Sequence, residues 1–205
     1  KVTYSKDLCS RYLDALLKEI HMTGEQTDTK KRVTSLYFGG GSPALAAERL
    51  PEIIEAVRQH FIISEGIGVE LHPEDVTVPL LQKLKNAGVT KISIGIQSFQ
   101  KKYQTLLGRR SIDLPAMHGA LKAVAFETVS MDFIFALPNQ TFADLKTDID
   151  TAFHHGANHI AIYPFIDFTF TASPLKAMKK KEKYRLLNKI TGYCLEQGYT
   201  RTSIW

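Results

Sequence analysis

The sequence predicts an α/β fold in which parallel strands alternate with helices, and three observations support this prediction. Short β-rich runs recur about 25 to 40 residues apart, which is the repeat of a β-α unit. Most of these runs are continuously apolar rather than alternating, as is typical of strands covered on both faces. Amphipathic stretches with helical spacing lie between them. A parallel β/α barrel, or part of one, is the preferred architecture, and a doubly wound open sheet is the alternative.

The six β-rich runs are the expected strands. The strands are residues 33–38, 68–71, 91–96, 130–135, 159–163 and 199–204. The chain begins instead with a helical pattern over residues 6–23. A regular β-α series needs a strand before that helix, so we expect the first strand of the barrel to lie upstream of Lys1.

The expected helices carry apolar stripes and terminal signals. The stripes are Leu8, Tyr12, Leu16 and Ile20 in the first helix, and Leu50, Ile53, Ile54, Val57 and Phe61 in the second. Pro79 suits the first turn of a helix that Gly88 ends. Thr141 and Asp144 form a capping signature for a helix that runs to about Phe153.

Composition and charge limit the class of protein. The 205 residues suffice for one domain with a sizeable core, and 44% hydrophobic with 23% charged residues is ordinary for a globular chain. No apolar run approaches the roughly 20 residues that a membrane span needs. The net charge of +5 is concentrated in residues 176–185, a pattern typical of a solvated helix face. No nucleic-acid-reading motif accompanies it, so we expect no nucleic-acid partner.

The two cysteines, Cys9 and Cys194, lie far apart within helical patterns. They do not form a disulfide framework, which favours a reducing, cytoplasmic setting. They are also too few for an all-cysteine iron–sulfur site within this chain. The chain starts at Lys1 without a methionine or a signal-peptide pattern, so we expect it to be a piece of a longer protein.

Polar residues stand at the ends of the expected strands, where parallel β/α folds carry their chemistry. They are Ser42 after the first strand, Glu70, His72, Glu74 and Asp75 at the second, Gln97 and Ser98 at the third, Asp132 in the fourth, and Tyr163 and Asp167 at the fifth. An acid among strand residues is costly unless it is paired or hydrogen-bonded. Glu70 and Asp132 therefore either pair with a loop or a buried base, or face a polar ligand. Convergence from successive strands favours the ligand.

The segment "GGGSP", residues 39–43, joins the first strand to a helix. It is neither a Walker loop nor a dinucleotide-binding fingerprint. A tight turn needs one glycine or two. Because glycine lets the backbone approach a ligand closely, three in a row favour a ligand-binding turn.

A set of motifs in a fixed order carries a family resemblance over about residues 12–163: "YFGGGSP", "VELHPE", "ISIGIQSF" with "LLGRR", and "MDFIFALPNQT". The chain resembles the radical S-adenosylmethionine (SAM) enzymes of the oxygen-independent coproporphyrinogen III oxidase type. That group includes haem-chaperone and haem-degrading relatives. The resemblance implies a partial parallel (β/α)6 barrel of radical SAM type over residues 1–205, truncated at both ends and lacking its first strand.

The resemblance also implies a reaction. A 4Fe-4S cluster, reduced by an external electron donor, cleaves SAM, and the resulting 5′-deoxyadenosyl radical abstracts hydrogen from a small-molecule substrate. For this family the substrate is a tetrapyrrole, as in porphyrin biosynthesis. Two alternatives stay open: a haem-binding chaperone or carrier with the same barrel and no oxidase activity, and a barrel enzyme that binds another anionic small molecule.

Site residues follow from the matched motifs, although no catalytic residue is assigned. Gly40, Gly41 and Ser42 are implied to meet the methionine part of SAM. The residues implied to hold its charged groups and ribose are Glu70, Gln97, Arg109 and Asp132, and Ile166 is implied to offer a backbone contact near the adenine. These residue types suit the task, because arginine binds carboxylates and acids accept from ammonium or hydroxyl groups.

The chain departs from the family pattern in three places. The C-x-x-x-C-x-x-C cluster loop is absent, so the metal ligands are expected upstream of Lys1 and the chain as given is expected to be inactive. "QSF", residues 97–99, resembles the chaperone-like branch more than the oxidases, and "FALP" replaces the more usual "YGLP". The segment after residue 163 lacks the family's Glu-x-Gly-Thr pattern. The substrate therefore stays open.

Overall fold

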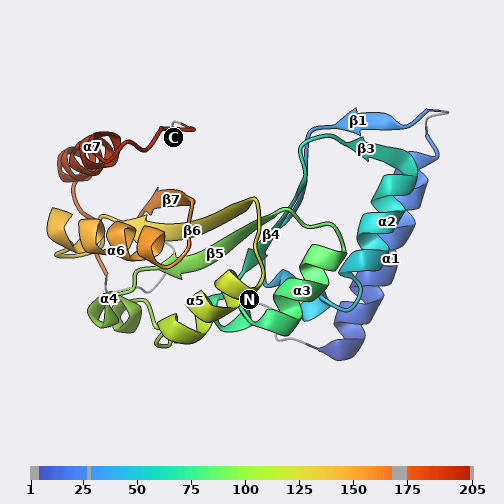
Figure 1. Ribbon diagram of the computed structural model, residues 1–205, viewed down its shortest axis with the longest axis horizontal. Coiled ribbons are helices and arrows are strands. Elements are labelled where there is room, and N and C mark those ends of the chain that lie inside the picture. Colours follow the sequence, from blue (N-terminus) through green and yellow to red (C-terminus); the bar gives the residue numbers. More distant parts are fainter. Residues whose placement is uncertain (1–4, 27–28, 168–174, 204–205) are drawn as a thin grey trace. The chain divides into compact units, whose positions relative to one another are not determined.

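The computed structural model describes residues 5–26, 29–167 and 175–203. Helices and strands alternate along the chain (Figure 1). In order they are α1 (Lys6–Gly24), β1 (Lys31–Val33), β2 (Leu36–Phe38), η1 (Pro43–Ala46), α2 (Leu50–His60), β3 (Phe61–Ile63), β4 (Ile67–Leu71), η2 (Pro73–Asp75), α3 (Val78–Asn86), β5 (Lys91–Gln97), α4 (Lys101–Leu106), α5 (Leu114–Ala123), β6 (Thr128–Phe135), α6 (Phe142–His154), β7 (His159–Pro164) and α7 (Lys180–Glu196). The predicted α/β class is confirmed.

The main sheet has the strand order β2-β4-β5-β6-β7, and β1 pairs with β3 in a second, two-stranded sheet. The pairs β2–β4 and β4–β5 are parallel, with Leu36 opposite Ile67 and Gly68 opposite Lys91. The strand interiors are apolar, as the sequence predicts. Met131 and Phe133 of β6 are fully buried.

The first predicted strand, residues 33–38, is two strands in the structure. The chain bends after Val33, and the neighbouring strand bends at the same level between β3 and β4. Hydrogen bonds continue through the bend, because the Ser64 amide donates to the Val33 carbonyl at 3.0 Å and the Leu36 amide donates to the Gly66 carbonyl at 3.2 Å. Gly66 has φ +113°, and a β-carbon there would lie 2.3 Å from Thr90 Oγ1, so the bend requires glycine at this position.

The sixth predicted strand, residues 199–204, is wrong for the described part, since residues 199–203 form no strand; residue 204 lies outside the described residues. The Tyr199 ring stacks on Phe153 at 4.0 Å between centroids. The Thr202 hydroxyl lies 3.3 Å from His159 Nε2. The aromatic and β-branched residues that suggested a strand instead make side-chain contacts within their own part of the chain.

The first helix buries only part of its predicted apolar stripe, since Leu16 and Ile20 are half-buried. Leu8 and Tyr12 are 47% and 63% exposed, whereas Leu13 and Gly24 are buried. Gly24 lies against α2, where a β-carbon would approach His60 Cγ to 2.0 Å. The stripe of α2 is confirmed for Leu50, Ile53, Ile54 and Val57, while Phe61 begins β3.

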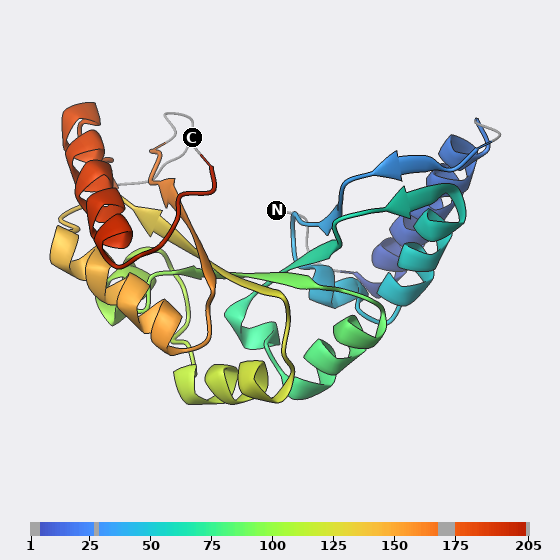
Figure 2. The ribbon, with the colours of Figure 1, turned by 45° about the horizontal axis from the view of Figure 1, so that its top comes forward.

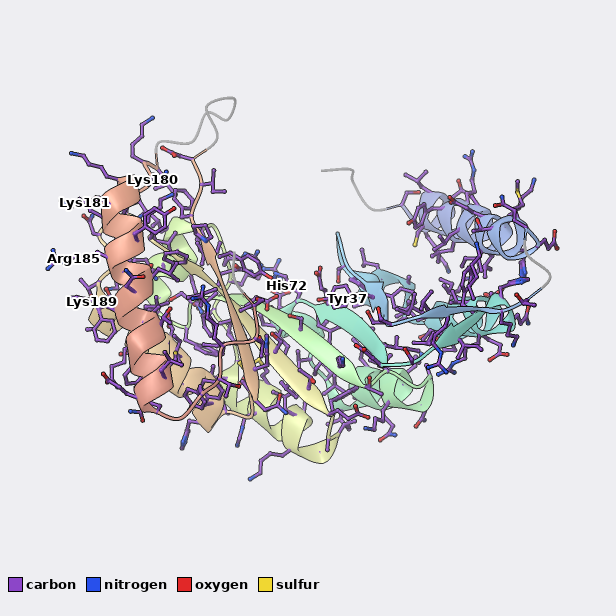
Figure 3. All side chains as sticks on the ribbon, turned by 90° about the horizontal axis from the view of Figure 1, so that it is seen from above. Tyr37, His72, Lys180, Lys181, Arg185 and Lys189 are labelled. Carbon is purple, nitrogen blue, oxygen red and sulfur yellow. The ribbon has the colours of Figure 1, made fainter. Side chains whose placement is uncertain are left out.

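The predicted helix termini agree with the structure. Pro79 lies in the first turn of α3, and Gly88, with φ +90°, follows its end. Thr141 and Asp144 form a capping box on α6. The lysine-rich segment contributes to α7, whose exposed positions include Lys180, Lys181, Arg185 and Lys189 (Figure 3).

The chain divides into two compact units: Lys1–Ile94 with Asp113–Ser130, and Gly95–Ile112 with Met131–Trp205. In the first, α1 packs against α2. In the second, α6 and α7 lie side by side (Figure 2), joined by a core of Phe135, Leu145, Ile149, Leu186 and Ile190. Among the described residues, no helix has the length and apolarity that crossing a membrane demands.

Candidate functional site

The glycine turn follows β2 in the first unit, and its three glycines have three different environments. A β-carbon on Gly39 would lie 3.0 Å from Glu70 Oε1, so this position leaves room for the Glu70 carboxylate. Gly40 has φ +89°, a conformation that favours glycine. A β-carbon on Gly41 would meet nothing within 4 Å, and the same is true of Gly40. The turn therefore presents open space at Gly40 and Gly41.

Glu70 joins this turn to the neighbouring strand. It lies near the end of β4, half-buried, and its Oε2 accepts a hydrogen bond of 3.1 Å from the Gly40 amide. The Ser42 hydroxyl donates to Asp75 Oδ2 at 2.9 Å, and the His72 amide donates to the same oxygen at 3.3 Å. The structure thus brings Gly40 and Glu70 together, and it links Ser42 to the loop that follows β4.

Tyr37 lies in β2, and His72 directly follows β4 (Figure 3). The Tyr37 ring covers Gly68, where a β-carbon would approach Tyr37 Cδ2 to 2.6 Å. Tyr37 remains 56% exposed. The small residue Gly68 on β4 therefore leaves room for the large, partly exposed Tyr37 ring.

The other predicted site residues lie in the second unit. Gln97 ends β5 with φ 68°, which is unusual for a residue other than glycine. Asp132 is half-buried in β6, between the buried Met131 and Phe133, and has a polar or electrostatic partner in the structure. Arg109 is exposed beyond α4, and Ile166 is 53% exposed after β7.

A buried carboxylate that sequence reasoning missed contacts the two residues that follow Gln97. Asp148 of α6 is 0% exposed; its Oδ2 accepts from the Ser98 hydroxyl at 2.7 Å and its Oδ1 from the Phe99 amide at 2.9 Å. Burial raises the pKa of Asp148 to about 6, although these donors oppose the shift. The available signal was its place on the apolar stripe of α6 beside Leu145 and Ile149.

The pKa of Asp144, one turn earlier on α6, is shifted in the opposite direction. Its carboxylate accepts from the Thr141 amide, the Tyr103 hydroxyl and the Lys102 ammonium at 2.8, 2.8 and 2.6 Å. Burial would raise the pKa of Asp144, but these donors outweigh burial and hold the pKa well below its usual range. Burial and the neighbouring Asp144 raise the pKa of Tyr103 to about 12.

The residues present fit part of the cofactor set that the resemblance implies. An open glycine turn beside a carboxylate suits a ligand that carries an ammonium group, as the methionine part of SAM does. A metal cluster is different. Among the described residues, no group of three His, Cys, Asp or Glu side chains could hold a metal, and Cys9 and Cys194 lie on separate helices. The glycine turn with Glu70 therefore suits the ammonium end of SAM, and the described residues offer no set of ligands for the cluster.

Fold and strand-end residues together define a class of protein, and comparison with known families agrees. The model of the radical SAM superfamily matches residues 11–152, more than half of the chain. The chain belongs to the radical SAM superfamily.

Curated relatives that match the chain carry two kinds of name, heme chaperone HemW and oxygen-independent coproporphyrinogen III oxidase. The heme chaperone HemW of Bacillus subtilis is 30% identical over 161 residues, which are 76% of this chain and 42% of that protein. An oxygen-independent coproporphyrinogen III oxidase of Bradyrhizobium diazoefficiens is 32% identical over 142 residues, 67% of this chain and 32% of that protein. The chain therefore spans less than half the length of the curated relatives it matches.

The fold agrees with a solved structure. Coproporphyrinogen III oxidase (HemN) from Escherichia coli aligns with a TM-score of 0.81 at 21% identity, over 98% of this chain and 48% of that one. At this identity the likeness concerns the fold alone. It confirms the radical SAM type of α/β fold that the motifs predict.

Proposed function

We propose that this chain supplies the SAM-binding part of a radical SAM protein that acts in tetrapyrrole or haem metabolism. One observation supports the proposal most: the Gly40 amide is bonded to the Glu70 carboxylate at 3.1 Å beside open space, at the ends of two parallel strands. In this reading Gly40, Gly41 and Ser42 bind the methionine part and Glu70 accepts from its ammonium group.

The remaining residues are assigned from the matched motifs, and they lie in the second unit. Gln97, Arg109 and Asp132 would hold the carboxylate and the ribose, and the backbone at Ile166 would contact the adenine. Bound SAM supplies a 5′-deoxyadenosyl group for hydrogen abstraction. The role of this chain is to bind and orient it, and the cluster, its cysteine ligands and an external electron donor come from outside the described residues. Unpaired Cys9 and Cys194 are consistent with the cytoplasm as the site of action.

A Glu70→Gln variant of the full-length, cluster-loaded protein tests the assignment. The parent should cleave SAM to 5′-deoxyadenosine under dithionite. Loss of a charge-assisted hydrogen bond, worth about 1.5 to 3 kcal/mol, should weaken SAM binding by roughly tenfold or more, measured by calorimetry. Glu55→Gln, on an exposed position of α2, is the matched control and should bind as the parent does. Equal affinity of the Glu70 variant and the parent would contradict the assignment.

A haem carrier with the same barrel is the second candidate, and the relatives named heme chaperone HemW favour it at 30% and 27% identity. Two assays on the full-length protein separate the candidates. Stoichiometric haemin binding followed by transfer to an acceptor protein supports the carrier. Conversion of coproporphyrinogen III to a product with vinyl groups supports the oxidase.

A further inference from the structure

The backbone at Gln97 is held in a conformation that it does not prefer. Its φ of 68° lies in the left-handed region, which costs an ordinary residue about 1 kcal/mol or more. Such conformations persist when surrounding contacts fix them, and they concentrate at functional positions. The backbone conformation of Gln97 is fixed by contacts to the residues that follow it, Ser98 and Phe99.

Asp148 bonds the two residues after Gln97 directly. Its Oδ2 accepts from the Ser98 hydroxyl at 2.7 Å and its Oδ1 from the Phe99 amide at 2.9 Å. Both Asp148 and Ser98 are 0% exposed. Since each carboxylate oxygen has its own donor and Asp148 is shielded from water, this side chain holds Ser98 and Phe99 directly.

Further bonds close the turn against α4 and α6. The Ser98 hydroxyl also accepts from the Gln100 amide at 3.1 Å, and Gln104 Nε2 donates to the Ser98 carbonyl at 3.1 Å. Gln100 Nε2 donates to the Asp144 carbonyl at 2.7 Å. Residues 98–100 are thus fixed on several sides, and Gln97 has little freedom to leave its conformation.

We infer that Asp148 is a positioning residue for SAM binding. Its carboxylate fixes the turn at Ser98 and Phe99, and so holds the side-chain amide of Gln97 in the orientation that binds the ligand. Asp148 itself does not touch SAM. This inference rests on the proposed function, in which Gln97 contacts SAM. It assigns a role to a residue on a helix, away from the strand ends that carry the family motifs.

A double-mutant cycle between Asp148 and Gln97 tests the inference by SAM affinity rather than by turnover. In the full-length, cluster-loaded protein, Asp148→Asn places an NH2 group where one of the two donors now points. We expect its dissociation constant for SAM to rise about tenfold, and that of Gln97→Ala to rise by a similar factor. Because both changes act through the same amide, Asp148→Asn with Gln97→Ala should bind no more weakly than Gln97→Ala alone.

Two controls separate positioning from loss of fold. Asp150→Asn lies on the same helix, where Asp150 pairs with Lys146 at the surface, and should leave SAM affinity unchanged. Ser98→Ala removes one donor to Asp148, and it replaces Asp148→Asn as the test if that variant does not fold. It should weaken SAM binding about threefold, with an unchanged circular-dichroism spectrum.

The outcomes distinguish this inference from the proposed function. Parental affinity in Asp148→Asn, or effects of Asp148→Asn and Gln97→Ala that multiply, would overturn the positioning role and leave the SAM site standing. A parent that does not bind SAM would overturn the proposed function, and the positioning role with it.

Discussion

At the scale of single residues, the glycine turn shows how one motif combines structural and functional demands. The sequence predicts that the run of three glycines forms a ligand-binding turn. In the structure, Gly39 leaves room for the Glu70 carboxylate and Gly40 adopts a positive φ, so two of the three have structural reasons. The Gly40–Glu70 contact joins residues 30 positions apart, which local sequence patterns do not reveal.

Gly41 is the glycine whose structural role is smallest, and this permits a sharp prediction. A β-carbon on Gly41 would meet nothing within 4 Å. Gly41→Ala should therefore change the free energy of unfolding by less than about 0.5 kcal/mol. If the open space holds SAM, the added methyl group should weaken SAM binding several-fold, measured by calorimetry on the full-length protein.

Gly40→Ala is the comparison for this prediction. It should destabilise the fold by about 1 kcal/mol in a urea titration, because its φ of +89° is costly for alanine. Unchanged SAM affinity in Gly41→Ala would place the ligand away from the turn.

Asp148 shows why part of the site could not be predicted. Glu70 and Asp132 stood out because acids are rare within apolar strands. Asp148 lies in "DLKTDIDTAF", where Asp144 and Asp150 make an acidic helix surface look ordinary. Its burial results from the packing of α6 against the turn after β5, a tertiary contact that helical periodicity alone does not specify.

At the scale of elements, periodicity predicted which segments are strands but not where they bend. Continuous apolar runs gave four strands of the main sheet nearly at their observed bounds: β4, β5, β6 and β7. The bend between β1 and β2 was missed, because residues 33–38 look uniform and the glycine that the bend requires, Gly66, lies between β3 and β4. Residues 199–203 have strand-like composition, yet Tyr199 stacks on Phe153 instead of joining the sheet.

Helix α6 should give the protein a distinctive pH dependence through Asp148. The pKa of Asp148 is raised to about 6, so the folded state holds this proton more tightly than the unfolded state does. Protonated Asp148 therefore stabilises the folded state. This contribution is fully present below a pH of about 4 and is lost as the pH rises through about 6. Relative to Asp148→Asn, the parental free energy of unfolding should fall by up to about 3 kcal/mol over this range.

Urea titrations of parent and variant at several pH values between about 4 and 7 measure this difference. The charge of Asp144 also acts on Asp148, but Asp144 is present in both proteins, so its own titration largely cancels in the comparison. A difference between parent and variant that does not change with pH would show that Asp148 titrates normally.

At the scale of the whole molecule, the chain is a recognisable part of a radical SAM protein. The superfamily model covers residues 11–152, and the fold of HemN aligns over 98% of the chain. The ordered motifs predicted this membership because each stands at the end of its own strand. Relatives named heme chaperone HemW and a relative named oxygen-independent coproporphyrinogen III oxidase match the chain at similar identity, 30% and 32%, so the comparisons support both candidate functions equally.

The most direct measurement is a crystal structure of the full-length, cluster-loaded protein with SAM bound. We predict the methionine part of SAM within hydrogen-bond distance of the turn at Gly40–Ser42 and of Glu70, with Gln97 and Asp132 also contacting the ligand. SAM bound with none of these residues within roughly 4 Å would contradict the account.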